Sequence, residues 1–362
     1  MRSIIDPGVL RNSVSKALSS FDGRVCYAVK ANPHPLVVRM IRSFGLKDFD
    51  VASKKEINLV KRIAPDADLL YTHPVKKLSE ILHAYREIGL RYFVVDGFEE
   101  IERIFKVCNP KHLEISVRFK TGTPKNTDAH ELDSKFGTDT ATGIRMLEHL
   151  QASGCKTSVS FHVGSQQTLP DAHFEAAKYL ANSLSNSSFS INSLSLGGGF
   201  PVSYETTSLT DLSEVFPNVD RIRSNFTIFQ GSQMIVEPGR CLIADAVRSE
   251  VTVTCVEGRR LFIDDGIYGG LLDCALSKVR YPISHRDRPF GSKSKKFKIF
   301  GPTCDSLDVL PGEYSLPCDT KENDVLVIHK TGAYGGNLTN NFNGLVPRQK
   351  YLVGPAFKME DA

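Results

Sequence analysis

Alternating strand and helix patterns between residues 24 and 242 constrain this chain more than any other feature. We expect eight strands, at Val25–Lys30, Phe49–Ser53, Leu69–His73, Tyr92–Asp96, Leu113–Phe119, Ser158–Gly164, Leu194–Gly198 and Met234–Arg240. Helical periodicity fills most of the gaps, at Lys55–Ile63, Leu78–Ile88, Glu99–Val107, Gly143–Gln151 and Ala172–Leu184. This α/β alternation predicts a (β/α)8 barrel of the TIM type, a fold of about 250 residues.

A doubly wound parallel sheet is the alternative fold. It commonly has fewer strands, and its glycine-rich fingerprint follows the first strand. In this chain Gly197-Gly198-Gly199 follows the seventh strand, where barrels often bind phosphate. Polar residues also mark the predicted strand ends, the barrel face that carries active sites. They are Lys30, Ser53, His73, Asp96, Arg118, His162 and Glu237.

The pattern changes after Ala244. Short alternating stretches separated by Gly and Pro turns predict strands at Ser249–Val256, Arg260–Asp264, Lys296–Phe300, Tyr314–Leu316 and Asp324–His329. With 362 residues, two domains are expected. We predict a barrel domain at 8–242 and an all-β domain at 243–362, with residues 1–7 as a candidate edge strand of the second domain.

Composition excludes several classes of protein. The net charge of +4 is too small, and Lys and Arg too dispersed, to indicate nucleic-acid binding. No apolar run reaches the roughly 20 residues of a membrane span, and the first 25 residues lack a signal-peptide core. The eight cysteines form no C-x-x-C pair or regular framework, so we expect reduced thiols, no metal site and a cytoplasmic location.

Five motifs supply the groups that pyridoxal phosphate chemistry needs. The Lys30 amine can form a Schiff base with an aldehyde cofactor. The Gly197–Gly199 backbone and the Arg240 guanidinium suit a phosphate, with hydroxyls from Ser165 and Tyr334. A carboxylate such as Glu237 keeps a pyridine nitrogen protonated, and the flat His162 ring can stack on it. A free thiol has a pKa of about 8.5, so Cys304 can donate a proton at neutral pH.

In order along the chain, these strings resemble the fold-type III pyridoxal-phosphate decarboxylases, the ornithine/diaminopimelate/arginine decarboxylase family, and most of all its short bacterial ornithine/lysine members. The matching strings are Y-A-V-K-A-N at 27–32, F-D-V-A-S at 49–53, K-F-G at 135–137, H-V-G-S-Q at 162–166, G-G-G-F-P at 197–201, E-P-G-R at 237–240, R-Y-P-I at 280–283, G-P-T-C-D-S at 301–306, G-A-Y at 332–334 and F-N-G at 342–344. The resemblance implies an alanine-racemase-like barrel followed by a β domain, and it covers nearly the whole chain.

The resemblance also implies residue roles. Lys30 would carry pyridoxal 5'-phosphate and Cys304 would return a proton to the substrate carbon, with His162 stacked on the cofactor ring. The other cofactor residues would be Asp50, Arg118, Ser165, Gly197, Gly198, Gly199, Glu237, Gly239, Arg240 and Tyr334. Two chains would form a homodimer in which Cys304 and Asp305 of one chain complete the site of the other. Lys135 and Asp308 would form an interchain salt bridge.

Asp305 favours a substrate with a distal cation: L-ornithine first, giving putrescine, then L-lysine, giving cadaverine, then L-arginine. Tyr268, Phe342 and Asp273 complete the predicted substrate set. Eukaryotic-type ornithine decarboxylases carry an aspartate where this chain has Ser277, so either Asp273 takes over that role or the substrate is atypical.

Four alternatives stay open. An alanine-type racemase normally has A-Y-G after K-A-N, where this chain has Asn32-Pro33-His34. A single-domain pyridoxal-phosphate carrier would lack residues 243–362. A decarboxylase of a decorated amino acid in a siderophore or peptide pathway is the strongest alternative. A catalytically inactive homologue that binds a regulator is the fourth, and the presence of both Lys30 and Cys304 argues against it.

Overall fold

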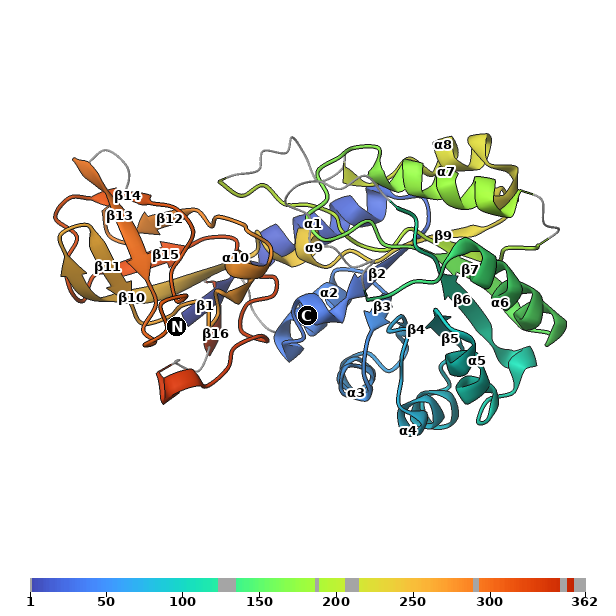
Figure 1. The fold of residues 1–362 in the computed structure, drawn as a ribbon. Coiled ribbons are helices and arrows are strands. Elements are labelled where there is room, and N and C mark those ends of the chain that lie inside the picture. The colour runs from blue at the N-terminus through green and yellow to red at the C-terminus, as the bar shows by residue number, and fades with distance from the viewer. Residues whose placement is uncertain are drawn as a thin grey trace. The chain divides into compact units, whose positions relative to one another are not determined.

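The computed structural model describes residues 2–122, 135–185, 189–205, 215–288, 293–345 and 350–354. The chain divides into two compact units (Figure 1). The barrel unit comprises Val14–Pro201 and Asp211–Gly239, and the β unit comprises Met1–Ser13, Val202–Thr210 and Arg240–Ala362. The division is not linear along the sequence, because the β unit also takes the amino-terminal residues and a short segment that follows the glycine triplet.

Eight parallel strands close into a barrel in sequence order, which confirms the predicted (β/α)8 architecture. The ring is completed where β2 pairs with β9, in the register Arg24↔Ile235. The strands are β2 (Arg24–Ala28), β3 (Asp48–Val51), β4 (Asp68–Tyr71), β5 (Tyr92–Val95), β6 (Glu114–Arg118), β7 (Lys156–Ser160), β8 (Ser193–Ser195) and β9 (Gln233–Val236).

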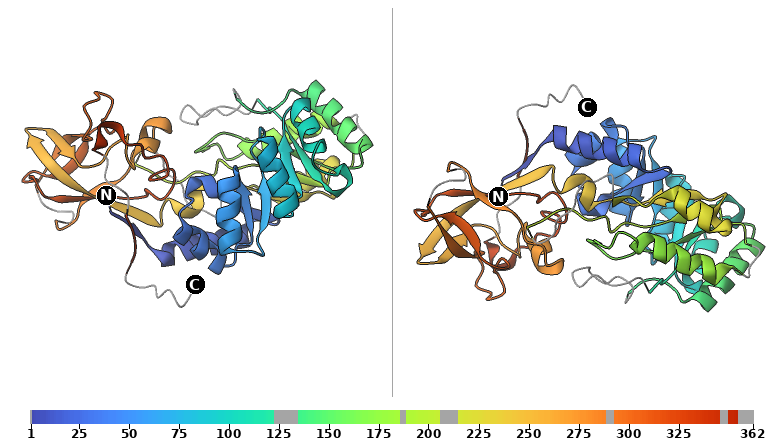
Figure 2. Two further views of the ribbon diagram at one scale, coloured as in Figure 1. Left: turned by 90° about the horizontal axis from the view of Figure 1, so that it is seen from below. Right: turned by 90° about the horizontal axis from the view of Figure 1, so that it is seen from above.

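Helices surround the strands of the barrel unit (Figure 2), and local sequence sets where they begin. At α3 the Ser53 hydroxyl caps the helix by accepting a hydrogen bond from Glu56 N, while Glu56 Oε2 accepts one at 2.7 Å from the N–H of Ala52, the residue before the cap. The helices are α2 (Pro35–Ser43), α3 (Lys54–Ile63), α4 (Leu78–Leu82) with a following π-helical turn (His83–Glu87), α5 (Phe98–Phe105), α6 (Thr140–Ala152), α7 (Ala172–Leu184) and α8 (Val219–Asn225).

Several observed strands end before the predicted ones, and this places two site residues in loops. β2 ends at Ala28, and Val29–Ala31 forms a 3-10 turn that contains Lys30. β7 ends at Ser160, so His162 lies in the loop that follows. The predicted strands were too long because an apolar pattern reports burial and not strand pairing. Val29, for example, is fully buried although it lies beyond the end of β2.

The β unit contains a sheet with the strand order β12-β15-β10-β11-β13-β14, to which β1 and β16 are joined. Its strands are β1 (Arg2–Ile5), β10 (Val247–Glu257), β11 (Arg260–Ile263), β12 (Ile283–His285), β13 (Ser294–Phe300), β14 (Tyr314–Pro317), β15 (Val325–Ile328) and β16 (Lys350–Val353). β1 pairs antiparallel with β10 and parallel with β16. The unit is therefore β-rich, as predicted.

Helices in the β unit and at the start of the chain were not predicted. α1 (Pro7–Ser20) follows β1, and α9 (Arg240–Ile243) and α10 (Leu272–Leu276) interrupt the β-rich part. α9 and α10 are too short to give a periodic signal. Within the described residues, no helix combines the length and the apolarity that a membrane crossing requires.

Candidate active site

Lys30 and Asp50 form an ion pair at the carboxyl ends of β2 and β3. Lys30 Nζ lies 3.1 Å from Asp50 Oδ2. The lysine side chain is 44% exposed, whereas the aspartate side chain is 1% exposed. The Thr72 hydroxyl donates to the other oxygen of Asp50. A buried and fully engaged carboxylate thus holds an accessible amine at the barrel face where the sequence predicts the reactive lysine.

His162 is held as a neutral ring beside the glycine triplet. Desolvation, the Arg118 guanidinium and the Lys30 ammonium lower its pKa well below the usual value. Gly164 N donates to His162 Nδ1 at 3.0 Å, so Nδ1 is an acceptor and the ring proton is on Nε2. A Cβ at Gly198 would lie 3.3 Å from Nε2, which shows how closely this ring approaches the loop backbone.

Glu237 is a desolvated carboxyl just beyond β9. Burial and the negative charge of Asp50 raise its pKa to about 7. The Ser195 hydroxyl donates to Glu237 Oε1 at 2.6 Å and accepts from Gly197 N at 3.2 Å. Such a carboxyl gains from an adjacent cation, and a protonated pyridine nitrogen is one. Its environment therefore fits the role predicted for it.

The glycine triplet can contain no other residue type. Gly197 and Gly199 have φ of +68° and +94°, and a Cβ at Gly199 would lie 2.2 Å from Gly164 O. A Cβ at Gly198 would lie 2.7 Å from Glu237 O. His173 Nε2 donates to Gly198 O at 3.0 Å, and its ring stacks on Phe200 with centroids 4.8 Å apart. The loop offers unobstructed backbone, as a phosphate site requires.

The remaining predicted cofactor residues of the barrel unit lie at the same face. Arg118 ends β6, and its charge lowers the pKa of both His162 and Glu237. Ser165 follows His162 in the loop after β7. A Cβ at Gly239 would lie 2.8 Å from Ala31 Cβ, so Gly239 packs directly against the turn that carries Lys30.

In the β unit, Arg240 is enclosed by side chains. Both Nη atoms bond the Asp273 carboxylate, Nη2 at 2.9 Å from Oδ1. Nη1 also donates to the Tyr204 hydroxyl and Nη2 to the Ser277 hydroxyl, each at 3.1 Å. The guanidinium lies 5.0 Å from the centre of the Tyr334 ring. The two phosphate residues predicted in this unit, Arg240 and Tyr334, are therefore neighbours.

The predicted substrate residues of the β unit form a second group, around Cys304. The Tyr268 hydroxyl donates to Asp305 Oδ2 at 2.6 Å, and together with the Leu307 amide it keeps the pKa of Asp305 below its usual value. The Tyr268 ring packs on Phe342 with centroids 5.0 Å apart. Cys304 is exposed. A charged carboxylate and a thiol thus share one loop.

Two predicted residues have partners that the sequence did not indicate. Asp273 was predicted to read the substrate, and in the structure it bonds Arg240 and Ser277. Asp308 is 2% exposed and accepts from Ile267 N, Thr303 N and the Thr303 hydroxyl. Lys135 is exposed and lies over the ring of its neighbour Phe136. The interchain bridge between Lys135 and Asp308 stays a prediction, and Asp308 has internal partners that organise its own loop.

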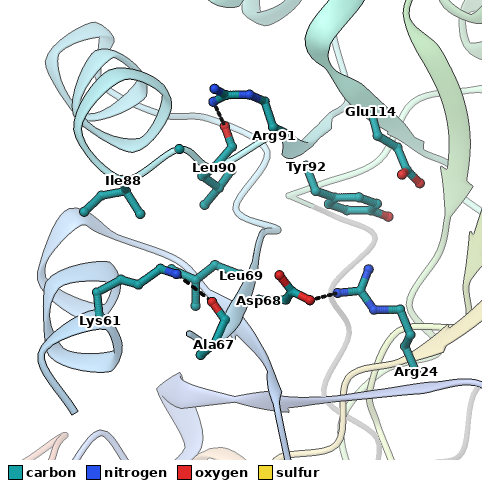
Figure 3. Close-up of a pocket in the computed structure, with 11 residues that line it drawn as sticks. Arg24, Lys61, Ala67, Asp68, Leu69, Ile88, Leu90, Arg91, Tyr92 and Glu114 are labelled. Atoms are coloured by element: carbon teal, nitrogen blue, oxygen red, sulfur yellow. Dashed lines mark hydrogen bonds and ion pairs between the residues drawn. The ribbon is translucent and has the colours of Figure 1, made fainter. Parts of the chain in front are cut away.

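A cavity of about 280 Å³ lies at the other end of the barrel (Figure 3). Its wall includes Arg24, Asp68, Tyr92 and Glu114, the first residues of β2, β4, β5 and β6. Lys61, also in the wall, donates to Ala67 O at 2.6 Å. This cavity is distinct from the face that carries Lys30, and none of the predicted site residues lines it.

Sequence reasoning missed Ser195 and His173. Ser195 is the last residue of β8 and stands two residues before the glycine triplet, so its position could have suggested a contact with the loop. His173 lies in α7, and its spacing carries no signal, because its partner Gly198 is 25 residues away.

The comparisons with known proteins identify the family of this chain. The model of the pyridoxal binding domain of pyridoxal-dependent decarboxylases matches residues 9–244. The lysine/ornithine decarboxylase of Selenomonas ruminantium is 28% identical over 347 residues, covering 93% of this chain and 84% of that protein. The ornithine decarboxylase of Mus musculus is 28% identical over 355 residues, covering 90% and 74%.

A solved structure gives the same result. The lysine/ornithine decarboxylase of Vibrio vulnificus, complexed with putrescine, is 27% identical and superposes with a TM-score of 0.84, covering 98% of this chain and 94% of that one. The chain belongs to the pyridoxal-dependent decarboxylases. It is an amino-acid decarboxylase that uses pyridoxal phosphate, and its relatives support a basic amino acid as the class of substrate.

Proposed function

We propose that this chain converts L-ornithine to putrescine, with L-lysine to cadaverine as a close second activity. The observation that carries the proposal is the Asp305 carboxylate, held ionised by the Tyr268 hydroxyl at 2.6 Å, one residue after the exposed Cys304. An ionised carboxylate beside a proton donor suits a substrate whose far end is an ammonium. The lysine/ornithine activity of the similar proteins supports the same choice.

The residues of the barrel unit would prepare the cofactor. Bound pyridoxal phosphate supplies an aldehyde that captures the substrate amine and a ring that accepts the electrons released with carbon dioxide. Lys30 would hold the aldehyde until substrate arrives, and Asp50 at 3.1 Å would take the proton that its ammonium must lose. Glu237 would keep the ring nitrogen protonated, and the neutral His162 would lie on the ring face without repelling that charge.

The residues of the β unit would act on the substrate. Asp305 would bind the distal ammonium, which fixes the orientation of the substrate carboxylate. Cys304 Sγ would then deliver its proton to the carbon from which carbon dioxide has left. Lys30 Nζ would replace the amine product and recover its place on the aldehyde. The thiolate regains a proton from solvent, so the residues end the cycle in their initial states.

We also propose that the working assembly is a homodimer with shared sites. Leu307, two residues after Asp305, is 68% exposed, and Phe342 and Leu345 are exposed as well. Large apolar side chains around a reactive thiol favour burial by a protein surface. A second copy of the chain would cover them and exclude water from the reacting carbon.

A decarboxylase of a decorated amino acid is the second candidate. It is favoured by one observation: Asp273, the acid predicted to replace the one missing at Ser277, has both oxygens engaged by Arg240. Asp305 would then be the single carboxylate that recognises the distal group of the substrate, and that group would differ from a simple ammonium.

Carbon dioxide release by the purified protein with pyridoxal phosphate tests these candidates. The substrates are L-ornithine, L-lysine, L-arginine, meso-diaminopimelate and the D-forms of each chiral amino acid, with Lys30→Ala as the control. Release from L-ornithine or L-lysine that Lys30→Ala abolishes supports the proposal. No release from any of them, with a cofactor absorbance band present, would overturn the substrate assignment. It would point to a decorated substrate or to an inactive homologue.

A further inference from the structure

Asp273 and Ser277 lie one helical turn apart at α10 in the β unit, and both are buried. The Asp273 and Arg240 side chains are each 4% exposed. Asp273 receives one Nη of Arg240 on each of its oxygens, and Oδ1 also accepts from the Ser277 hydroxyl at 2.7 Å. The acid that the sequence assigned to the substrate is therefore fully occupied by other groups.

A buried carboxylate in this state is a poor receptor for a substrate cation. Its charge is neutralised by a guanidinium in bidentate geometry, which is the strongest common form of ion pair. Drawing it toward a distal ammonium would leave Arg240 as an uncompensated buried charge, a strongly unfavourable state. Asp305 differs on both counts, because its described partners are a hydroxyl and an amide, both neutral.

The same contacts fix where Arg240 lies. Asp273 and Ser277 hold the guanidinium through α10, and the Tyr204 hydroxyl holds it from the segment before residue 206. Tyr204 is itself packed edge-on against Tyr281, with ring centroids 5.5 Å apart. A phosphate oxygen that reached Arg240 would share its N–H groups with these partners. The carboxylate thus sets both the position of the guanidinium and the positive charge that it offers.

We propose that Asp273 is a positioning residue for Arg240 and acts at the phosphate end of the cofactor, and that it is not the acid that reads the substrate. Ser277 completes the same enclosure of Arg240. Recognition of the distal group then belongs to Asp305 and Tyr268. The proposal rests on the proposed pyridoxal-phosphate function and on the phosphate-binding role that the sequence predicts for Arg240, and it adds that the acid on α10 serves the cofactor.

Binding of two aldehydes to the apoenzyme tests this without turnover. Pyridoxal phosphate and pyridoxal differ only in the phosphate, so the ratio of their dissociation constants measures the contribution of the phosphate. For Asp273→Asn we expect the dissociation constant of pyridoxal phosphate to rise about tenfold, with that of pyridoxal nearly unchanged. At saturating cofactor, the KM for the preferred amino acid should change less than threefold. Asp305→Asn should do the reverse, raising KM and leaving both aldehydes unaffected.

Two variants separate positioning from general damage. Asp265 is another buried aspartate of the β unit, which accepts from Gly266 N and Gly270 N, so Asp265→Asn is a matched control. Asp265→Asn should weaken the binding of both aldehydes equally or leave both dissociation constants unchanged. In Asp273→Asn/Ser277→Asp the carboxylate moves to a position whose present hydroxyl is 3.1 Å from Nη2. That double variant should recover most of the affinity for pyridoxal phosphate.

Three results would overturn the proposal. A rise in KM of tenfold or more with unchanged aldehyde binding would make Asp273 a substrate acid. Tighter binding of pyridoxal phosphate in Asp273→Asn would make it a competitor of the phosphate for Arg240. An equal loss for both aldehydes, not recovered in the double variant, would make its role structural. Because these constants are read without turnover, they stand even when none of the tested amino acids is decarboxylated.

Discussion

The barrel unit buries the carboxylate that pairs with Lys30, whereas the β unit presents its Cys304 thiol at the surface. Asp50 is 1% exposed and the pKa of Glu237 is raised to about 7, so the electrostatics of the barrel site are set inside one unit. Cys304 is exposed, and nearby Leu307 is 68% exposed. This contrast supports the proposals that the barrel residues bind the cofactor within one unit and that another protein surface covers the thiol.

The largest loss of activity should come from substituting one reactive residue in each unit. Lys30→Ala and Cys304→Ala should each lose activity by on the order of a hundredfold or more, because each removes a proton-transfer group. If the cover is a second chain, mixing the two variants under exchange conditions should restore about a quarter of wild-type activity. Half of the dimers would be mixed, and each would have one intact site of two. Decarboxylation after mixing is the measurement.

The matched control for that mixture uses two variants of the barrel unit. Lys30→Ala mixed with His162→Ala leaves no site with an intact barrel set, so activity should stay at the level of the separate variants. Recovery of activity in this control would mean that Lys30 and His162 of one chain need not act in the same site, which contradicts the proposed sharing. No recovery in the first mixture, despite verified exchange of chains, would place Cys304 in the site of its own chain.

The next effect concerns the rigid loop of the barrel unit. Gly199 has φ of +94°, and an added Cβ would lie 2.2 Å from Gly164 O. Gly199→Ala should therefore strain the backbone by about 1–3 kcal/mol and weaken pyridoxal phosphate about 10–100-fold in a binding titration. Gly89→Ala is the control, because Gly89 also has a positive φ (+77°) but no atom within 4 Å of the added Cβ. It should lose stability without losing cofactor affinity.

The sequence predicted the architecture of the barrel because strands and helices alternate with different periods, and each period reports burial on one face. It predicted the helix Ala172–Leu184 to the residue. It placed strand ends less well, since Val29 stays buried after β2 has ended. It missed α2, whose first residue is Pro35 and whose cap is His34, because this start lies inside a string that also suits a turn.

The candidate site could be predicted as a set of residue types, but its pairings could not. Motif order gave Lys30, Glu237 and Arg240. It gave no sign that Asp50 would hold Lys30, or that Asp273 would hold Arg240, because those partners are 20 and 33 residues away. Such contacts arise when different strands and helices meet, and no local pattern contains them.

The contrast in burial also predicts a pH dependence for the apoenzyme. The pKa of Glu237 is raised from 4.5 to about 7, so the folded chain binds this proton more tightly than the unfolded chain. Its contribution to stability is complete below pH 4.5 and is lost as pH rises through about 7. In Glu237→Gln this loss disappears. The variant should gain on the order of 1–3 kcal/mol relative to wild type between pH 5 and pH 8.

Chemical denaturation of both apoproteins across that range measures the difference. Saturating pyridoxal phosphate supplies a cation for the carboxylate and should reduce the pH dependence of the wild type. A constant difference between wild type and Glu237→Gln from pH 5 to pH 8 would contradict the desolvated carboxyl. Glu237 would then be more accessible to water than its raised pKa implies.

The smallest effect on cofactor affinity should come from His173, where the contribution of ring stacking can be separated from that of the hydrogen bond to the glycine triplet. Burial lowers the pKa of His173 to about 4, so its ring is neutral and donates through Nε2 to Gly198 O. His173→Phe keeps a ring to stack on Phe200 but removes the donor, which should cost about 1 kcal/mol, or roughly fivefold in affinity for pyridoxal phosphate. His173→Gln keeps a donor without the ring. Because His173 does not titrate between pH 5 and pH 9, the loss of affinity for pyridoxal phosphate in His173→Phe should be the same at pH 5 and at pH 9. A loss that grew toward low pH would mean that the imidazole carries charge, and that this part of the barrel unit is as open to water as the loop of Cys304.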